Sequence, residues 1–382
     1  MFDSHRSICK PSMPTPWPLG SSFPSLHQTM APHDNFIASH NVASVLAEVK
    51  EQPSELVDLS LDSTVEEAFD VLLANDILSV PVYRVEDETK VYVAIVGVLD
   101  LLKFTTIQPA IDNLNTQSQV LPDFGTLYDR SQFLLRPLKD VIGLTPESAQ
   151  LFIVHPSDPL SELLRLFTSR RVHRVLVVDD GAHTPREMLS HRAIDLTKFN
   201  AAKRISHPVL LSQTDVVRFL WRHNHHLGKI LDTPAGGIAN RSRRLFPSST
   251  LLNPEPENTV IVTIHQTALQ AFSHISSTDV QAVVVVDDDG EVVGEISAGD
   301  LRGLNRNRVM DLVRPVIMFL RNTQGQLFRP LMCHARFTLS QCVSALVKGE
   351  AHRVWMVDEE ERPIGVVTLS DVLSVFVPAT EE

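Results

Sequence analysis

The chain has 382 residues, 43% of them apolar, and its formal net charge at pH 7 is -12. This composition supports the hydrophobic cores of two or three domains and excludes a chain that is disordered throughout. The acidic balance argues against a protein that neutralises many nucleic-acid phosphates, so we expect no nucleic-acid partner.

Cysteine content and apolar runs restrict the compartment. The three cysteines are too few and too scattered for a disulfide framework or a zinc site. This usage is typical of a reducing compartment, and we expect a cytoplasmic or nuclear protein. The longest apolar runs, such as VYVAIVGVL, fall short of the roughly 18 residues that span a bilayer, so we expect no membrane partner.

The first 40 residues differ from the rest of the chain. They contain six of the 24 prolines, show no periodic apolar pattern, and lack the basic start and apolar core of a signal peptide. We therefore predict a disordered tail over residues 1–40.

One pattern of helix, strand, acidic turn, strand and helix then recurs in four units along the chain. The units cover residues 56–108, 137–224, 255–306 and 326–378. The second unit has an insertion at 181–206, and residues 227–254, rich in Pro, Gly, Ser and Asn, are predicted to link two pairs of units. A single unit buries too little surface to be stable, so we expect the units to pair.

Two units share a further motif, a His-Arg doublet at the start of their first long strand. It occurs in RVHRVLVVDD (171–180) and in HRVWMVDEEERPIGVVTLSD (352–371). With this motif the four repeats resemble cystathionine-beta-synthase (CBS) domains, and their order is similar to that in the gamma regulatory subunit of the AMP-activated protein kinase family. The resemblance implies a mixed α/β fold of four CBS repeats, paired into two Bateman modules that form a pseudo-symmetric disk.

Three units close their second strand with Ser or Thr, followed three residues later by Asp. The pairs are Ser212 with Asp215, Ser297 with Asp300, and Thr368 with Asp371. This spacing is typical of helix capping, in which hydroxyl and carboxylate accept hydrogen bonds from free amides. A carboxylate in the first helical turn can also accept hydrogen bonds from a ribose diol, which is the role that the resemblance implies.

The first unit departs from this spacing. Our alignment places Asp100 at the hydroxyl position and Lys103 at the carboxylate position. Because lysine cannot accept hydrogen bonds, we predict that this site is empty or binds phosphate instead.

The doublets His173–Arg174 and His352–Arg353 are candidates for phosphate contacts, because arginine presents a fixed fork of donors. The alternative is a pair of solvated polar residues at a strand entrance. The resemblance implies that the doublets face phosphates at the centre of the disk. Leu78 and Gln281 stand at the matching positions of the other two units, so we expect fewer phosphate contacts than in the family's best binders.

The resemblance also implies that Thr263 and Ala282 line an adenine pocket in the third unit, although a plain strand threonine and a core alanine would look the same. His223, His225 and His226 are typical of a solvated helix end rather than a metal site. No nucleotide-hydrolase, dinucleotide-binding, nucleophile-elbow or zinc-protease motif occurs, so we predict that the chain is not an enzyme.

Together, the repeats and the resemblance predict a regulatory subunit that binds AMP, ADP or ATP and needs no other cofactor. The implied partners are a serine/threonine kinase catalytic alpha subunit and its beta scaffold. Two alternatives remain: a stand-alone CBS nucleotide sensor that regulates another enzyme, and a structural adaptor whose pockets have decayed.

Overall fold

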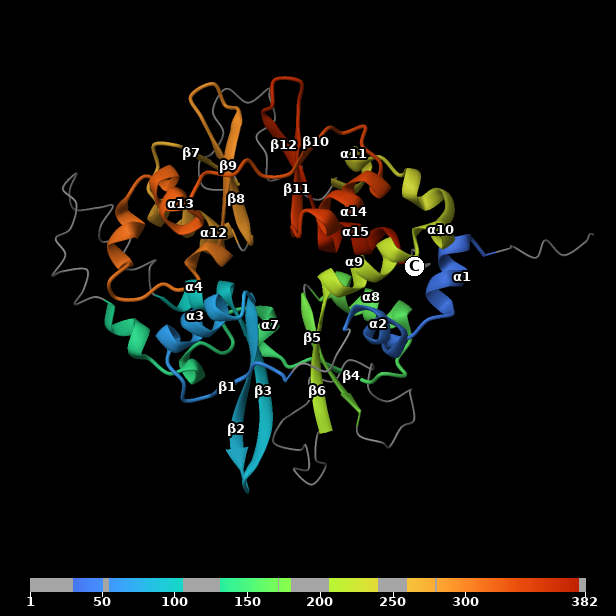
Figure 1. Cartoon of the computed structure of the whole chain (residues 1–382), viewed down its shortest axis with the longest axis horizontal. Helices are drawn as coiled ribbons and strands as arrows, with labels where there is room; N and C mark the ends of the chain where they lie inside the picture. Colours follow the sequence, from blue (N-terminus) through green and yellow to red (C-terminus); the bar gives the residue numbers. More distant parts are fainter. Residues whose placement is uncertain are drawn as a thin grey trace, which may run out of the picture.

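The computed structural model describes residues 30–50, 55–105, 131–170, 172–179, 206–239, 260–278 and 280–377. Four three-stranded sheets surround the centre of the molecule, with units 1 and 2 on one side and units 3 and 4 on the other (Figure 1). This arrangement confirms the mixed α/β fold of four repeats in a disk.

Each unit contains one element more than the repeat pattern predicted. A first strand of two or three residues precedes the helix and pairs in parallel with the second strand, which pairs antiparallel with the third. In units 1 and 2 the elements are β1 (Leu59–Ser60), α3 (Val65–Ala74), β2 (Ser79–Glu86), β3 (Thr89–Gly97) and α4 (Val98–Phe104), then β4 (Ile153–Val154), α8 (Leu160–Ser169), β5 (Arg174–Asp179), β6 (Ser206–Ser212) and α9 (Gln213–Arg222). In units 3 and 4 they are β7 (Ile261–Thr263), α12 (Ala268–Thr278), β8 (Ala282–Val286), β9 (Val292–Ser297) and the 3-10 helix η6 (Ala298–Leu301), then β10 (Met332–Cys333), α14 (Leu339–Lys348), β11 (Arg353–Val357), β12 (Pro363–Thr368) and α15 (Leu369–Val375).

Shorter segments connect the units. They are α1 (Pro32–Ala38), α2 (Val42–Val49), η1 (Ser131–Leu135), η2 (Leu138–Asp140), α7 (Pro146–Ala149), α10 (Asn224–Leu227), η3 (Gly228–Asp232), α11 (Ala235–Ile238), η7 (Val309–Val313) and α13 (Val316–Gln324). The insertion predicted at 181–206 lies outside the described residues, apart from Ser206, where β6 begins.

The helix starts follow from local sequence. Thr64 caps α3 and Thr338 caps α14, and in each case the residue at the third helical position, Glu67 or Gln341, bonds back to the amide of the cap. These reciprocal bonds satisfy amides that have no partner inside the helix. Each helix then turns an apolar stripe toward the core.

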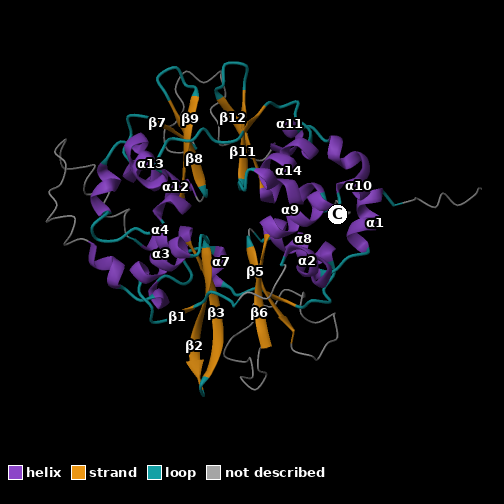
Figure 2. Ribbon diagram, in the orientation of Figure 1, coloured by secondary structure: helices purple, strands orange, loops and turns teal. Residues whose placement is uncertain are grey.

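Two large cores hold the helices together, and each is shared across the modules. The first joins units 1 and 3, with Phe69 and Phe272 among its fully buried side chains, and the second joins units 2 and 4, with Phe219 and Phe376. Figure 2 shows the helices gathered in two groups, while the sheets run outward from the centre. The modules therefore associate through their helices.

Within a module the sheets face each other. In the first module, Ile95 of β3 packs with Leu176 of β5 in a small apolar cluster. In the second, Trp355 of β11 belongs to the same core as β8 and donates a hydrogen bond of 2.5 Å from Nε1 to Glu295 Oε2 on β9.

At the start of its first helix, every unit forms an isolated β-bridge with a connecting segment that lies outside the repeat pattern. Isolated bridges join Thr64 to Pro137, Asn41 to Pro159, Thr267 to Pro315 and Pro234 to Thr338. The residues just before α2 and α11 therefore pair with units 2 and 4 in the same way as the residues just before η2 and α13 pair with units 1 and 3.

Two sequence predictions are therefore wrong in part. Residues 30–40 of the predicted disordered tail contain α1, whose Phe36 and Ile37 are buried, while residues 1–29 lie outside the described residues. Residues 228–239 of the predicted linker form η3 and α11 against unit 4, with Ala235 buried. Proline and glycine content hid these short apolar helices. No helix among the described residues is long and apolar enough to cross a membrane.

The buried tail helix leads to a prediction about stability. Phe36 is 7% exposed and packs against the rings of His40, Phe219 and His223. We expect Phe36→Ala to lower the free energy of unfolding by about 3–5 kcal/mol, the usual cost of deleting a buried Phe side chain. Met318→Ala, on the exposed face of α13 and 42% exposed, is the control and should change stability little. Urea unfolding followed by circular dichroism measures both, and equal midpoints for the two variants would show that α1 is not part of the fold.

Candidate functional site

Four equivalent junctions between a strand and a helix meet near the centre of the disk. The strand pairing aligns the last strand residue of each unit, Gly97, Ser212, Ser297 or Thr368, with Ser79, Arg174, Ala282 or Arg353. Each junction then places an aspartate at the third helical position.

The aspartates all cap their helices. Oδ2 of Asp215, Asp300 and Asp371 accepts hydrogen bonds from the backbone N–H of the cap residue at 2.7–2.9 Å and from its hydroxyl at 2.7–2.9 Å. Capping is therefore real in all three copies, and ribose binding would use the remaining lone pairs of the same carboxylates.

The alignment of the first unit was wrong by one turn of helix. Gly97, not Asp100, stands at the hydroxyl position, and Asp100 stands at the carboxylate position, where its Oδ2 accepts a hydrogen bond from Gly97 N–H at 3.0 Å. Lys103 lies one turn further along α4. The glycine removed the Ser or Thr by which the motif was recognised.

Other side chains of the protein form hydrogen bonds or ion pairs with three of the four junction carboxylates. Asp100 Oδ1 accepts a hydrogen bond from Ser148 Oγ at 2.5 Å, and Asp300 Oδ1 accepts one from Gln324 Nε2 at 2.9 Å. Asp215 Oδ2 lies 3.1 Å from Lys50 Nζ. Burial raises the pKa of the Asp100 and Asp300 carboxyls, because a charged carboxylate is disfavoured away from water.

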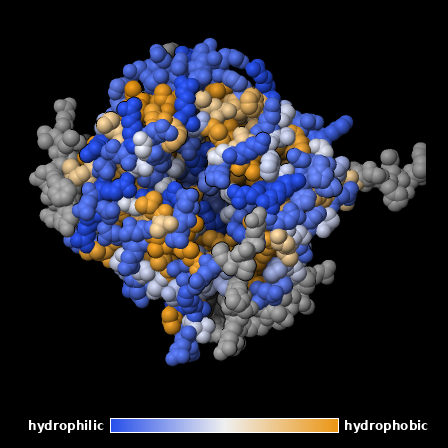
Figure 3. Space-filling view, in the orientation of Figure 1, coloured by the Kyte–Doolittle hydropathy of each residue, from blue (hydrophilic) through white to orange (hydrophobic). Residues whose placement is uncertain are grey.

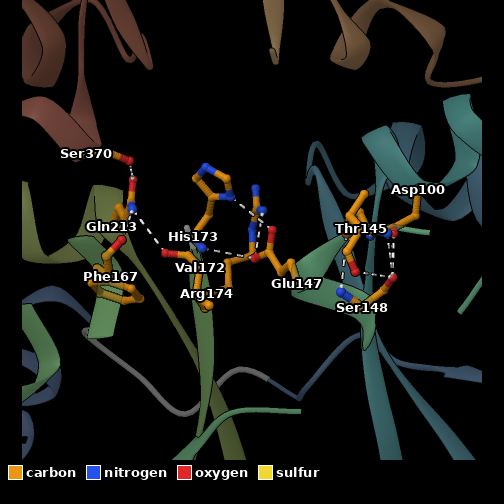
Figure 4. Close-up of polar contacts among 11 residues, drawn as sticks. Asp100, Thr145, Glu147, Ser148, Phe167, Val172, His173, Arg174, Gln213 and Ser370 are labelled. Atoms are coloured by element: carbon orange, nitrogen blue, oxygen red, sulfur yellow. Dashed lines mark hydrogen bonds and ion pairs between the residues drawn. The ribbon is translucent and has the colours of Figure 1, made fainter. Parts of the chain in front are cut away.

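The His-Arg doublets lie at the same junctions, and in the first module a carboxylate pairs with the doublet. Glu147 of α7 accepts hydrogen bonds from His173 N–H at 3.2 Å and pairs with His173 Nδ1 at 3.0 Å, while its Oε1 lies 3.7 Å from Arg174 Nη1 (Figure 4). Burial alone would raise the Glu147 pKa, but the hydrogen bond from His173 and the charge of Arg174 lower it below its usual value.

In the second module Arg353 pairs with a different carboxylate. Its Nη1 lies 2.5 Å from Oε1 of Glu295, a residue of β9 in unit 3. Because Trp355 donates to the other oxygen of Glu295, this carboxylate ties the sheets of units 3 and 4 together at the centre of the disk.

Basic side chains from three units converge there. His352 is exposed, yet the surrounding protein and the charges of Arg353, Arg174, His173 and Arg302 lower its pKa to about 4. Figure 3 shows a hollow with a hydrophilic lining at the centre of the face in view. A concentration of donors and positive charge of this kind suits a phosphate group.

Thr263 and Ala282 are not brought together. Ala282 begins β8 opposite Ser297, beside the junction, and is 5% exposed. Thr263 pairs with Val286 at the far end of β8 and is exposed. The histidines His223 and His226 pack around Phe36, and in the described part of the chain no group of His, Cys, Asp or Glu has the arrangement of a metal site.

Six residues that contact the junctions or the doublets were not predicted from the sequence. They are Lys50, Glu147, Ser148, Glu295, Arg302 and Gln324. Only Arg302, two residues after Asp300, carried a local signal. The others reach the junctions from distant segments, which spacing along the chain cannot reveal.

Comparisons with known proteins agree with this architecture. The CBS domain family model matches residues 139–194, 255–305 and 328–378, which fall on units 2, 3 and 4. Unit 1 has the same order of strands and helices and completes the set.

Several relatives are regulatory subunits. The gamma subunit of 5'-AMP-activated protein kinase from Saccharomyces cerevisiae is 24% identical over 83% of this chain and 85% of its own length. The SNF1-related protein kinase regulatory subunit gamma-like PV42b from Arabidopsis thaliana is 24% identical over 63% of this chain and 67% of its own length.

Among solved structures, protein MJ1225 from Methanocaldococcus jannaschii has a similar fold, with a TM-score of 0.56 and 15% identity over 85% of this chain and 97% of its own. Three segments of the chain therefore match the CBS domain family model and a fourth unit has the same strand order, and the chain as a whole is similar to gamma regulatory subunits of the AMP-activated protein kinase family.

Proposed function

We propose that this chain binds adenine nucleotides at the centre of the disk and regulates a serine/threonine protein kinase as its gamma-type subunit. The observation that carries the proposal is that His173, Arg174, Arg302 and Arg353 all lie close enough to His352 for their charges to act on it, with Arg174 and Arg353 at equivalent strand-to-helix junctions. Like charges are costly to hold together, and an anion such as a nucleotide phosphate compensates that cost.

The carboxylates of the junctions supply the second half of the site. Asp300 and Asp371 stand at the starts of their helices, on the same junctions as Ala282 and Arg353. A ribose that bonds to a carboxylate here would direct its phosphate toward the basic residues at the centre. One junction can therefore contact both ends of a nucleoside phosphate.

Regulation would follow from exchange rather than turnover. AMP, ADP and ATP differ in the number of phosphates that the basic residues can contact, so each would favour a different arrangement of the modules or of a bound partner. Because the two cores are each shared between modules, a change at the centre reaches both helix groups.

A structural adaptor is the second candidate, and one observation favours it. Both arginines of the doublets already pair with carboxylates, Arg174 with Glu147 and Arg353 with Glu295. If these pairs persist in the presence of nucleotide, the centre of the disk is a structural salt-bridge cluster.

Calorimetry with the purified chain separates the two candidates. We expect AMP, ADP and ATP to bind without hydrolysis, and Asp371→Ala to weaken binding by about 1–3 kcal/mol through the loss of charge-assisted hydrogen bonds. Ser374→Ala is the control, because that hydroxyl lies on the same helix and its one hydrogen bond to the described part of the chain goes to the backbone carbonyl of Asp371. No binding of any of the three nucleotides would favour the adaptor, whereas equal binding by wild type and Asp371→Ala would place the ribose on another residue.

The pH dependence of binding tests the position of His352. Its pKa of about 4 in the folded chain means that it is neutral near pH 7, and a phosphate beside it would raise that pKa. AMP binding should then take up a proton and tighten as the pH falls from about 7 to about 5. Titrations in two buffers of different ionisation heat measure the uptake. His352→Gln is the control, because it lacks the imidazole while the phosphate of AMP titrates in the same way with both proteins. If both proteins show the same pH dependence, the phosphate does not bind beside His352.

The kinase partnership has its own test. Two of the relatives reported above are named as kinase regulatory subunits, so we expect affinity purification of the full chain from its source cell to recover a kinase catalytic subunit and a beta subunit. Recovery of this chain alone or as homo-oligomers, under gentle conditions, would instead indicate a stand-alone nucleotide sensor.

A further inference from the structure

The short helix α7 reaches both junctions of the first module. Its residues Glu147 and Ser148 are only 8% and 1% exposed, and they point in different directions, toward the doublet of unit 2 and toward Asp100 of unit 1 (Figure 4). Thr145 caps the helix through Ser148 N–H at 3.3 Å, so the segment holds one defined conformation.

Glu147 contacts its neighbours as an anionic ligand would. Its Oε1 accepts a hydrogen bond from the backbone N–H of His173, its Oε2 pairs with His173 Nδ1, and Oε1 also forms an ion pair with Arg174 Nη1 at 3.7 Å. These are the donors that a phosphate would use if the doublet faced a nucleotide.

Ser148 makes the matching contact at the other junction. Its hydroxyl donates to Asp100 Oδ1, while Oδ2 of the same carboxylate accepts the Gly97 amide. A ribose hydroxyl would approach the junction carboxylate as a donor in the same way. The anionic and the hydroxyl contacts of the first module are thus both made by neighbouring residues of one helix.

In the second module Gln324 Nε2 donates to Asp300 Oδ1 as Ser148 does to Asp100, but the histidine of the doublet is not bonded in the same way. Glu295 pairs with Arg353 through one guanidinium nitrogen, Nη1, and directs its other oxygen to Trp355. Within the described ranges no side chain forms a hydrogen bond or an ion pair with His352. The residue at the strand position of Glu295 in unit 1 is Ile95, which is apolar and buried, so the first module uses α7 where the second uses its own strand.

We propose that α7 is a built-in substitute for a ligand, which closes the first module and confines nucleotide binding to the second. This inference rests on the proposed function, because it states which of the two modules takes the nucleotide. Glu147 stands for the phosphate and Ser148 for a ribose hydroxyl.

The covalent tether makes this substitution hard to displace. A tethered group acts at an effective concentration of about millimolar or more, and α7 is already ordered by its cap and by burial. A free nucleotide must expel a buried carboxylate before it can contact Arg174, so its apparent affinity for the first module is reduced by the small fraction of open molecules.

Removal of the carboxylate should open the module. We expect Glu147→Ala to bind one AMP per chain more than wild type, with no comparable gain for adenosine, and Arg174→Gln added to Glu147→Ala should remove the extra site. Glu359→Ala is the matched control, since it removes the same charge from a side chain that is 78% exposed and should leave the stoichiometry unchanged. Calorimetry gives the stoichiometry, and thermal melting with and without AMP shows whether the extra site stabilises the fold.

The outcomes distinguish this inference from the proposed function. If wild type binds no nucleotide but Glu147→Ala gains a phosphate-dependent site, the substitution by α7 stands and the proposed function of the wild-type chain fails. If wild type binds nucleotide and Glu147→Ala binds the same number, merely melting lower, Glu147 is a structural residue and the inference is overturned. If Glu147→Ala does not fold, Glu147→Gln replaces it, because glutamine keeps the shape of the side chain without its charge. We expect Glu147→Gln to show the same gain in AMP binding. A folded Glu147→Gln without that gain overturns the inference.

Discussion

One repeat unit cannot bury the apolar faces of its two helices, and the arrangement of the four units depends on this constraint. The units solve it by sharing cores across modules, unit 1 with unit 3 and unit 2 with unit 4. Because the helices that begin at the junctions are buried in these cores, the ends of their strands are drawn to the middle of the disk. The convergence of site residues is therefore a consequence of hydrophobic burial.

Burial of the helices creates an electrostatic problem at the centre. The charges of His173, Arg174, Arg302 and Arg353 all act on His352. In the first module Glu147 pairs with the basic doublet. In the second module Glu295 pairs with Arg353 and also accepts a hydrogen bond from Trp355. The two modules differ at the histidine of the doublet, because Glu147 bonds to His173 whereas no described side chain bonds to His352, and our proposal that only the second module accepts a phosphate rests on this difference.

Sequence patterns predicted the repeats, their pairing and three of the four junction carboxylates, because these features recur at constant spacing. They did not predict residues that are brought to the site by contacts between distant segments. Asp100 was misaligned because Gly97 lacks the hydroxyl that marks the junction, although strand pairing with Ser79 identifies it at once. The α1 helix was missed because its apolar surface is one short turn, stabilised by rings from α9 and α10 rather than by its own propensity. Glu147 was not predicted because its partner His173 lies 26 residues away along the chain.

We propose that the fold binds nucleotide in the second module, while α7 occupies the first. A crystal structure of the full chain grown with AMP tests it most directly. The account predicts a ribose on a junction carboxylate of the second module, a phosphate beside His352 and Arg353, and Glu147 still paired with His173 and Arg174. A nucleotide in the first module with Glu147 displaced, or a centre without nucleotide under saturating AMP, would contradict it.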